Sequence, residues 1–156
     1  AATNSRTQTI GILATQGTLN SELFNKTTEI YRDTKIIEQV GHGLVQLIES
    51  GNIDSLEMTK LLQEYLKPMI EANIDYLVLG CSHYPYLIPQ LKKILPPNIQ
   101  IIDSGEAVAR QTQNVLKEKV GLSVLKNGEP LFYTNSDPKV LSEILGYKYK
   151  VIEKDF

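Results

Sequence analysis

Cys81 is the residue of this chain whose chemistry stands out. It is the single cysteine among 156 residues, in the run Gly80-Cys81-Ser82-His83, with an imidazole two positions along. A thiolate can act as a nucleophile or as a general base, and a nearby histidine can supply a proton or a charge. The alternative is that Cys81 is a small buried apolar side chain, as free cysteines often are. The preceding glycine and the following Ser-His pair favour a chemical role.

The segments on either side of Cys81 predict a strand before it and a helix after it. Residues 75–80 (DYLVLG) are the clearest predicted strand, because their continuous run YLVLG is typical of a buried parallel strand. Pro85 suits the first turn of a helix that we expect to continue to about Leu95. Ligands of open α/β sheets bind at the carboxyl ends of strands, and a helix N-terminus favours anions. This position therefore favours a reactive thiolate.

The rest of the chain alternates short apolar runs with amphipathic segments. Further strands are expected at 9–14, 35–39, 99–102, 131–134 and 149–153, and further helices at about 21–31, 43–49, 54–72, 106–120 and 137–145. Asp54 and Glu57 have the spacing of a capping box, and Leu56 is expected on the apolar face behind it. Leu23 and Ile30 are expected on a buried stripe. The alternation predicts an α/β fold with a layered, mainly parallel sheet flanked by helices.

Composition and charge argue against several classes of protein. The net charge is -2, and the Lys and Arg residues are scattered, so we expect no nucleic-acid partner. No apolar stretch approaches the roughly 18 residues of a membrane span, and the polar first residues are not a signal peptide. One cysteine excludes an internal disulfide and a cysteine-based zinc site. We therefore expect no metal, no membrane partner and a reducing, cytoplasmic location.

A boundary is expected near residues 103–106. The strands and helices before it are enough to close a compact domain. After it, the chain holds only two short predicted strands and two helices, and a segment of about fifty residues is marginal as an independent core. We expect residues 1–104 to form one lobe and residues 105–156 to pack on something else.

Four stretches of the sequence resemble glutamate racemases, members of the aspartate/glutamate racemase superfamily. Residues 80–85 (GCSHYP) are similar to the family signature GCTHYP. The other three are residues 10–15 with Thr18 and Ser21, similar to a strand-loop stretch with two spaced threonines; residues 44–51, similar to an LVPLVEEG-like segment; and residues 102–110, similar to IDSG-x-A-x-AR. These matches occur in the family order and run from residue 10 to residue 110 of the chain.

The resemblance implies interconversion of L- and D-glutamate without a cofactor. One cysteine thiolate removes the α-proton, and a second cysteine on the opposite face returns a proton with inverted configuration. Cys81 matches the cysteine of the C-terminal half, His83 the histidine that assists it, and Glu49 a carboxylate that orients or tunes the site. The positions that match substrate-holding groups are Ser82, His83, Thr15 and Thr18. Without the resemblance, the threonines could equally cap a helix, and Glu49 would be a solvated charge.

Departures from the family pattern matter as much as the matches. Ser82 stands where the family usually has Thr, which keeps the hydroxyl. The family's N-terminal half carries a DSG-x-GG-like loop, a Pro-Tyr-Gly turn and a Cys-Asn-Thr motif with the other cysteine, and this sequence contains none of them. We therefore expect a C-terminal part that is inactive alone. Residues 1–104 would be the middle lobe, and residues 105–156 would return to the missing N-terminal lobe.

The resemblance also implies a setting for the intact enzyme. It would be a homodimer in the cytoplasm, supplying D-glutamate for peptidoglycan and hence for the cell wall and cell shape. Two alternatives stay open. The intact protein could be an aspartate or hydantoin racemase of the same superfamily, although Tyr84-Pro85 after His83 favours the glutamate branch. The chain could also be a binding module with no catalytic role.

Overall fold

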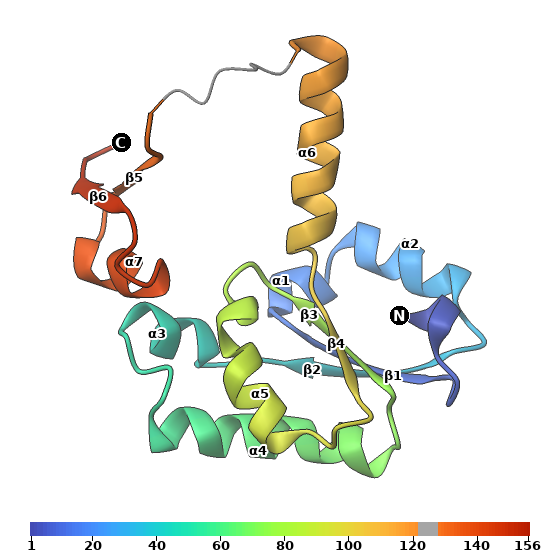
Figure 1. Cartoon of the computed structure of the whole chain (residues 1–156). Coiled ribbons are helices and arrows are strands. Elements are labelled where there is room, and N and C mark those ends of the chain that lie inside the picture. The colour runs from blue at the N-terminus through green and yellow to red at the C-terminus, as the bar shows by residue number, and fades with distance from the viewer. Residues whose placement is uncertain (122–127) are drawn as a thin grey trace.

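The computed structural model describes residues 1–121 and 128–156. A four-stranded parallel sheet of order β2-β1-β3-β4 lies at the centre of the part before residue 103 (Figure 1). Its strands are β1 (Thr9–Ala14), β2 (Lys35–Val40), β3 (Tyr76–Gly80) and β4 (Gln100–Ile102). All of β1 is buried, as a central strand covered on both faces should be. The predicted α/β class and all four strands are confirmed.

Helices cover both faces of this sheet. One face carries α3 (Leu44–Glu49), α4 (Leu56–Glu71), the short 3₁₀ helix η2 (Tyr84–Leu87) and α5 (Ile88–Ile94). The other face carries α1 (Gln16–Leu19), α2 (Glu22–Ile30) and the N-terminal turn η1 (Ala2–Asn4). Alternate residues of β1 point to the two layers: Leu13 packs under α4, whereas Ile10 and Ile12 face α2.

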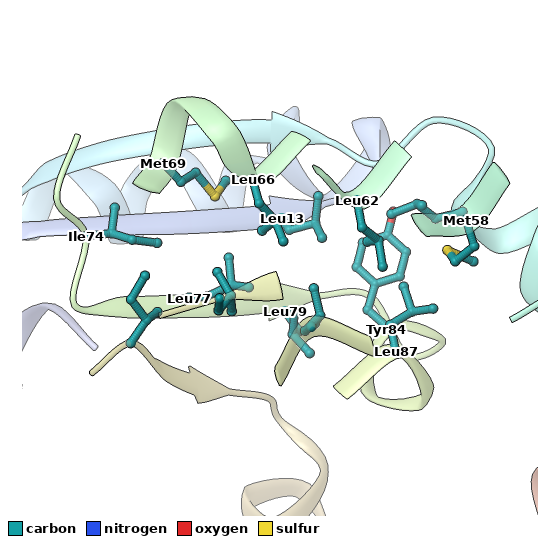
Figure 2. Packing of buried hydrophobic residues seen from close by; sticks show 14 of the residues in the cluster. Leu13, Met58, Leu62, Leu66, Met69, Ile74, Leu77, Leu79, Tyr84 and Leu87 are labelled. Atoms are coloured by element: carbon teal, nitrogen blue, oxygen red, sulfur yellow. The ribbon is translucent and has the colours of Figure 1, made fainter. Parts of the chain in front are cut away.

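The larger core lies between α4 and the sheet. Figure 2 shows Leu66 and Met69 of α4 beside Leu13 of β1, and Leu62 of the same helix beside Tyr84; Leu77 of β3 belongs to the same cluster. These side chains are inaccessible to solvent. Gly11 lets the helix approach β1 closely, because a Cβ at this position would lie 2.6 Å from Met69 Sδ. The strand that leads to Cys81 is therefore held by the larger of the two buried clusters.

Three local predictions were wrong. Leu23 and Ile30 of α2 are 77% and 75% exposed, because that helix rests on the sheet mainly through Phe24. Leu56 is 80% exposed at the first turn of α4. Ser55, rather than Asp54, caps α4 by accepting a hydrogen bond from Met58 N–H. Asp54 instead accepts a hydrogen bond from the Gln90 side chain, which ties the start of α4 to α5.

The segment after β4 has a different character. Helix α6 (Gly105–Lys119) is exposed along its whole length. Beyond it, β5 (Leu131–Thr134) and β6 (Lys150–Glu153) pair in parallel, with α7 (Pro138–Ile144) between them in sequence. These elements match the predicted ones, and residues 122–127 of this segment lie outside the described residues. Among the described residues, no helix is both long and apolar enough to cross a bilayer.

Asp75 ties the N-terminal segment to the start of β3. Ser5 Oγ donates to Asp75 Oδ1 at 2.6 Å, and the backbone N–H groups of Arg6 and Thr7 donate to Oδ2 at 2.6 and 3.2 Å. Burial raises the pKa of this carboxyl, but the hydrogen bonds outweigh burial and lower the pKa from its ordinary 3.8 to about 2. The ionised form therefore stabilises the folded chain.

Replacing Asp75 with asparagine should weaken the acid dependence of stability. Because the folded-state pKa is depressed, the contribution of Asp75 is fully present above about pH 4 and is lost as the pH falls toward about 2. We expect Asp75→Asn to lower the free energy of unfolding by about 1 kcal/mol at neutral pH. Urea unfolding at several pH values measures both effects, with exposed Asp33→Asn as the control. An unchanged acid dependence in Asp75→Asn would contradict this assignment.

Candidate active site

Cys81 lies at the carboxyl end of β3 and borders a cavity of about 740 Å³. Its side chain is partly buried, with some packing against the larger core. The cavity lies between α2, the ends of β3 and β4, and the start of α6; its polar lining comes from Thr18, Ser21, Thr27, Ser82, Asp103 and Ser104. A volume in this range is typical of small-molecule sites. Cys81 thus borders the cavity and is only partly buried, rather than sealed in the core.

The structure brings three of the predicted residues into one row. Cys81 Sγ lies 3.9 Å from His83 Nδ1, and His83 Nε2 lies 3.1 Å from Glu49 Oε1. His83 follows Cys81 by two residues, whereas Glu49 comes from the last position of α3, 34 residues away in sequence from His83. The imidazole therefore stands between the thiol and the carboxylate.

The Glu49 contact selects the tautomer of His83. A carboxylate only accepts hydrogen bonds, so the neutral imidazole places its proton on Nε2. The lone pair on Nδ1 then faces Cys81 Sγ, where it can accept the thiol proton. The side chains of His83 and Glu49 are 33% and 62% exposed, so their contact adds little to stability even when the imidazole is protonated. A hydrogen bond at Nε2 restricts the rotation of the ring.

Tyr84 anchors the turn that carries Cys81 and His83. Its side chain is fully buried, and its hydroxyl donates to the Gly41 carbonyl at 3.1 Å. Burial raises the pKa of the Tyr84 phenol, and the nearby Cys81 and Tyr65 add to the effect, so this hydroxyl stays protonated as a donor. Because Gly41 follows β2 and precedes α3, the contact fixes the turn relative to the helix that ends at Glu49.

Of the other predicted substrate-holding residues, two line the cavity and one does not. Ser82 and Thr18 line the cavity beside Cys81. Thr15 caps α1, because its Oγ1 accepts the Thr18 N–H at 3.3 Å, and it is not among the residues that line the cavity. The capping interpretation of Thr15 is therefore confirmed in the described residues. Its role toward a substrate stays a prediction.

Asp103 and Ser104, which the sequence analysis did not name as site residues, also line the cavity. Asp103 Oδ1 accepts the Gly105 N–H at 2.7 Å, so Asp103, rather than Ser104, holds the turn before α6. Both residues directly follow β4, which pairs with β3. The rule that neighbouring parallel strands end at the same edge of a sheet could have placed them here.

Comparison with known proteins defines the class first. Residues 1–112 match the Asp/Glu/Hydantoin racemase family, and the chain belongs to that family. Within the family, the chain is 42% identical over 146 residues to a glutamate racemase of Pseudomonas putida, covering 93% of this chain and 55% of the relative. It is 37% identical over 148 residues to the glutamate racemase of Pseudomonas syringae pv. tomato, covering 94% of this chain and 54% of the relative. The predicted resemblance to glutamate racemases is confirmed.

Solved structures give the same picture of the fold. The crystal structure of a glutamate racemase isoform from Bacillus anthracis is similar with a TM-score of 0.79 and 28% identity, covering 100% of this chain and 60% of that chain. The glutamate racemase of Francisella tularensis in complex with D-glutamate has a TM-score of 0.77 and 25% identity, covering 96% of this chain and 57% of that chain. The chain spans slightly more than half the length of the relatives it matches.

Proposed function

We propose that the intact protein is a glutamate racemase and that this chain supplies one of its two proton-carrying thiols. The observation that carries the proposal is the row of Cys81, His83 and Glu49, in which Cys81 borders a cavity at the carboxyl end of β3, while His83 and Glu49 are not among the residues that line that cavity. The names of the relatives support glutamate as the substrate, and the Francisella tularensis structure holds D-glutamate. The intact protein would therefore be an isomerase that interconverts L- and D-glutamate.

The reaction that this geometry supports is a proton transfer. The Cys81 thiolate would form an S–H bond with the α-proton of glutamate, and the electron pair of the broken C–H bond would stay on the α-carbon. A thiol on the opposite face would then donate its proton to that carbon, which inverts the configuration. His83 would hold the Cys81 proton between turnovers through Nδ1, and Glu49 would keep the ring turned for that exchange. Two thiols complete this cycle without a cofactor.

The substrate-holding roles form the next part of the proposal. Ser82 borders the cavity next to Cys81, and its hydroxyl could hydrogen-bond a substrate carboxylate. His83 matches a substrate-holding position of the family, and we include it among the candidates for contact with the substrate. Thr15 and Thr18 lie at the same edge of the sheet, at the end of β1. Their matched positions in the family make them candidates for the wall of the amino-acid pocket.

The missing half of the site would come from a lobe outside this chain. Helix α6 is exposed along its length, and β5 and β6 form a parallel pair whose Leu131 and Tyr133 are 52% and 47% exposed. Parallel sheets are normally buried on both faces. We propose that residues 105–156 pack on an N-terminal lobe that carries the second cysteine, while residues 1–104 form the middle lobe. The intact enzyme would be a cytoplasmic homodimer that supplies D-glutamate for peptidoglycan.

Two other functions remain as outcomes of experiment. A racemase acting on aspartate or on hydantoins would use the same thiol at the same strand end. A binding module without catalysis would keep the cavity and need no second thiol. Racemisation of glutamate, aspartate and a hydantoin by the intact protein, followed by circular dichroism, separates the three functions.

We expect the intact protein to racemise glutamate at least about tenfold faster than aspartate, since rejecting a shorter side chain by one methylene is worth about that factor. We expect the 156-residue chain alone to exchange the α-proton of glutamate with deuterium slowly or not at all, because one wall of its pocket is absent. Proton NMR in deuterium oxide measures this exchange. Faster turnover of aspartate would contradict the substrate, and rapid stereospecific exchange by the chain alone would contradict the incomplete pocket.

A further inference from the structure

Two threonine hydroxyls form a chain of hydrogen bonds that ends on the peptide next to Cys81. Thr18 Oγ1 donates to the Gly80 carbonyl oxygen at 3.0 Å, across 62 residues of sequence. Thr15 Oγ1 lies 3.0 Å from Thr18 Oγ1 and also accepts the Thr18 N–H at 3.3 Å. The turn after β1 is thereby joined to the end of β3.

The direction of these bonds is set by the number of protons. A threonine hydroxyl has one proton, and that of Thr18 is used on the Gly80 carbonyl. In the contact between the two hydroxyls, Thr15 must therefore be the donor and Thr18 the acceptor. A hydroxyl that accepts one hydrogen bond becomes a stronger donor in the next. Thr15 thus strengthens the hydrogen bond that Thr18 donates to the Gly80 carbonyl.

Gly80 makes this close approach possible. A Cβ at Gly80 would lie 2.7 Å from Ala14 Cβ and 3.4 Å from Thr18 Cγ2. The absence of a side chain lets the last residue of β3 lie against the end of β1, within reach of the Thr18 hydroxyl. The same peptide unit continues into Cys81, so its orientation sets the direction of the Cα–Cβ bond of the cysteine.

We propose that Thr18 is a positioning residue for Cys81. The Thr18 hydroxyl, which accepts a hydrogen bond from Thr15, fixes the Gly80 carbonyl. The peptide between Gly80 and Cys81 is thereby held in the orientation that directs the thiol toward His83. The inference rests on the proposed function of Cys81 as a proton carrier. It gives Thr18 a role distinct from holding a substrate carboxylate, since the single proton of its hydroxyl is already used. A shift of the thiol of even about 1 Å can greatly slow a proton transfer that depends on near contact.

The single cysteine allows a test that needs no turnover. The rate constant for alkylation of Cys81 by iodoacetamide is measured on the 156-residue chain from about pH 5 to about pH 10, once with His83 in place and once with His83→Ala. When no other residue is changed, His83→Ala should alter the pH profile of this rate constant. In Thr18→Val, which removes the hydroxyl but keeps the shape, we expect the effect of His83→Ala to shrink by at least about threefold, as for residues that act in one network. Thr18→Ser should restore the effect.

A matched control separates positioning from loss of stability. Thr27 lines the same cavity, but its hydroxyl donates to the Leu23 carbonyl within α2 at 2.7 Å, so Thr27→Val removes a hydroxyl without touching Gly80. We expect Thr27→Val to keep the full effect of His83→Ala, while urea unfolding reports the stability of each variant. Thr15→Val, which removes the donor to Thr18, serves as the second variant if Thr18→Val does not fold, and it should shrink the effect in the same direction.

Equal effects of His83→Ala in the unaltered chain, Thr18→Val and Thr15→Val would overturn the proposal. The same holds if Thr18→Ser behaves as Thr18→Val does. The result does not depend on racemisation. If the intact protein failed to racemise glutamate, the proposed function would fall while the coupling of Thr18, Cys81 and His83 could still be measured.

Discussion

Replacing Cys81 with alanine in the intact protein should stop racemisation but leave one-sided proton exchange. In the proposed mechanism each thiol would serve one face of the α-carbon, so the loss of Cys81 would remove the base for one enantiomer and the acid for the other. A positioned acid or base contributes about 10²–10⁴-fold to a rate, so we expect racemisation to fall by at least about 10³-fold. The thiol on the opposite face can still remove and return a proton. In deuterium oxide, one enantiomer should therefore exchange its α-proton without inversion.

Cys81→Ser is the matched variant for this experiment. It keeps the size and polarity of the side chain, but an alcohol is a far weaker acid than a thiol and cannot hold the anionic form near neutral pH. We expect Cys81→Ser to match Cys81→Ala in racemisation, and Ser82→Thr, which introduces the usual residue of the family, to keep activity within about threefold of the unaltered enzyme. Racemisation by Cys81→Ala within about tenfold of the unaltered enzyme, or exchange of both enantiomers, would contradict the assignment of Cys81.

The strands and the place of Cys81 could be predicted because the relevant signals are local. An apolar run such as residues 76–80 is typical of a buried strand in a parallel sheet, and the residues directly after such a strand lie at the carboxyl edge of the sheet. The exposure of Leu23 and Leu56 could not be predicted in the same way. Whether an apolar helix residue is covered depends on which neighbour packs on the helix, and the sequence pattern does not carry that information.

The contacts between the residues of the site could not be predicted from the residue patterns alone. His83 and Glu49 meet across 34 residues because α3 ends near the turn after β3, and nothing in either local pattern gives that distance. The resemblance to glutamate racemases named Glu49, but only the geometry places its carboxylate on His83 Nε2. The Thr18 contact with Gly80 is similar: the sequence presents the glycine as part of a motif, whereas its physical role is to let two strand ends touch.

Tyr84 controls the alignment of Cys81, His83 and Glu49, because one buried side chain supports both segments. Its backbone N–H donates to the Cys81 carbonyl at 3.2 Å, and its hydroxyl donates to Gly41, two residues before Gly43, the cap of α3. A Cβ at Gly41 would collide with the Tyr84 hydroxyl, so the fit between ring and loop leaves no spare room. Loss of the ring should therefore damage both the core and the row of functional side chains.

We expect Tyr84→Ala to lower the free energy of unfolding by about 3–5 kcal/mol, because it removes a fully buried aromatic ring and leaves a cavity. Tyr84→Phe keeps the ring and removes only the hydroxyl, so it should lose about 1–2 kcal/mol through the unpaired Gly41 carbonyl. Urea unfolding measures both, with Tyr86→Phe, at a tyrosine that is 40% exposed, as the control.

Because Tyr84→Phe also removes the hydrogen bond between the turn and Gly41, it should weaken the effect of His83→Ala on Cys81 alkylation while the chain stays folded. Equal stability of Tyr84→Phe and Tyr86→Phe, with that effect intact, would mean that the turn is held by packing alone and that the hydrogen bond to Gly41 does not align the site.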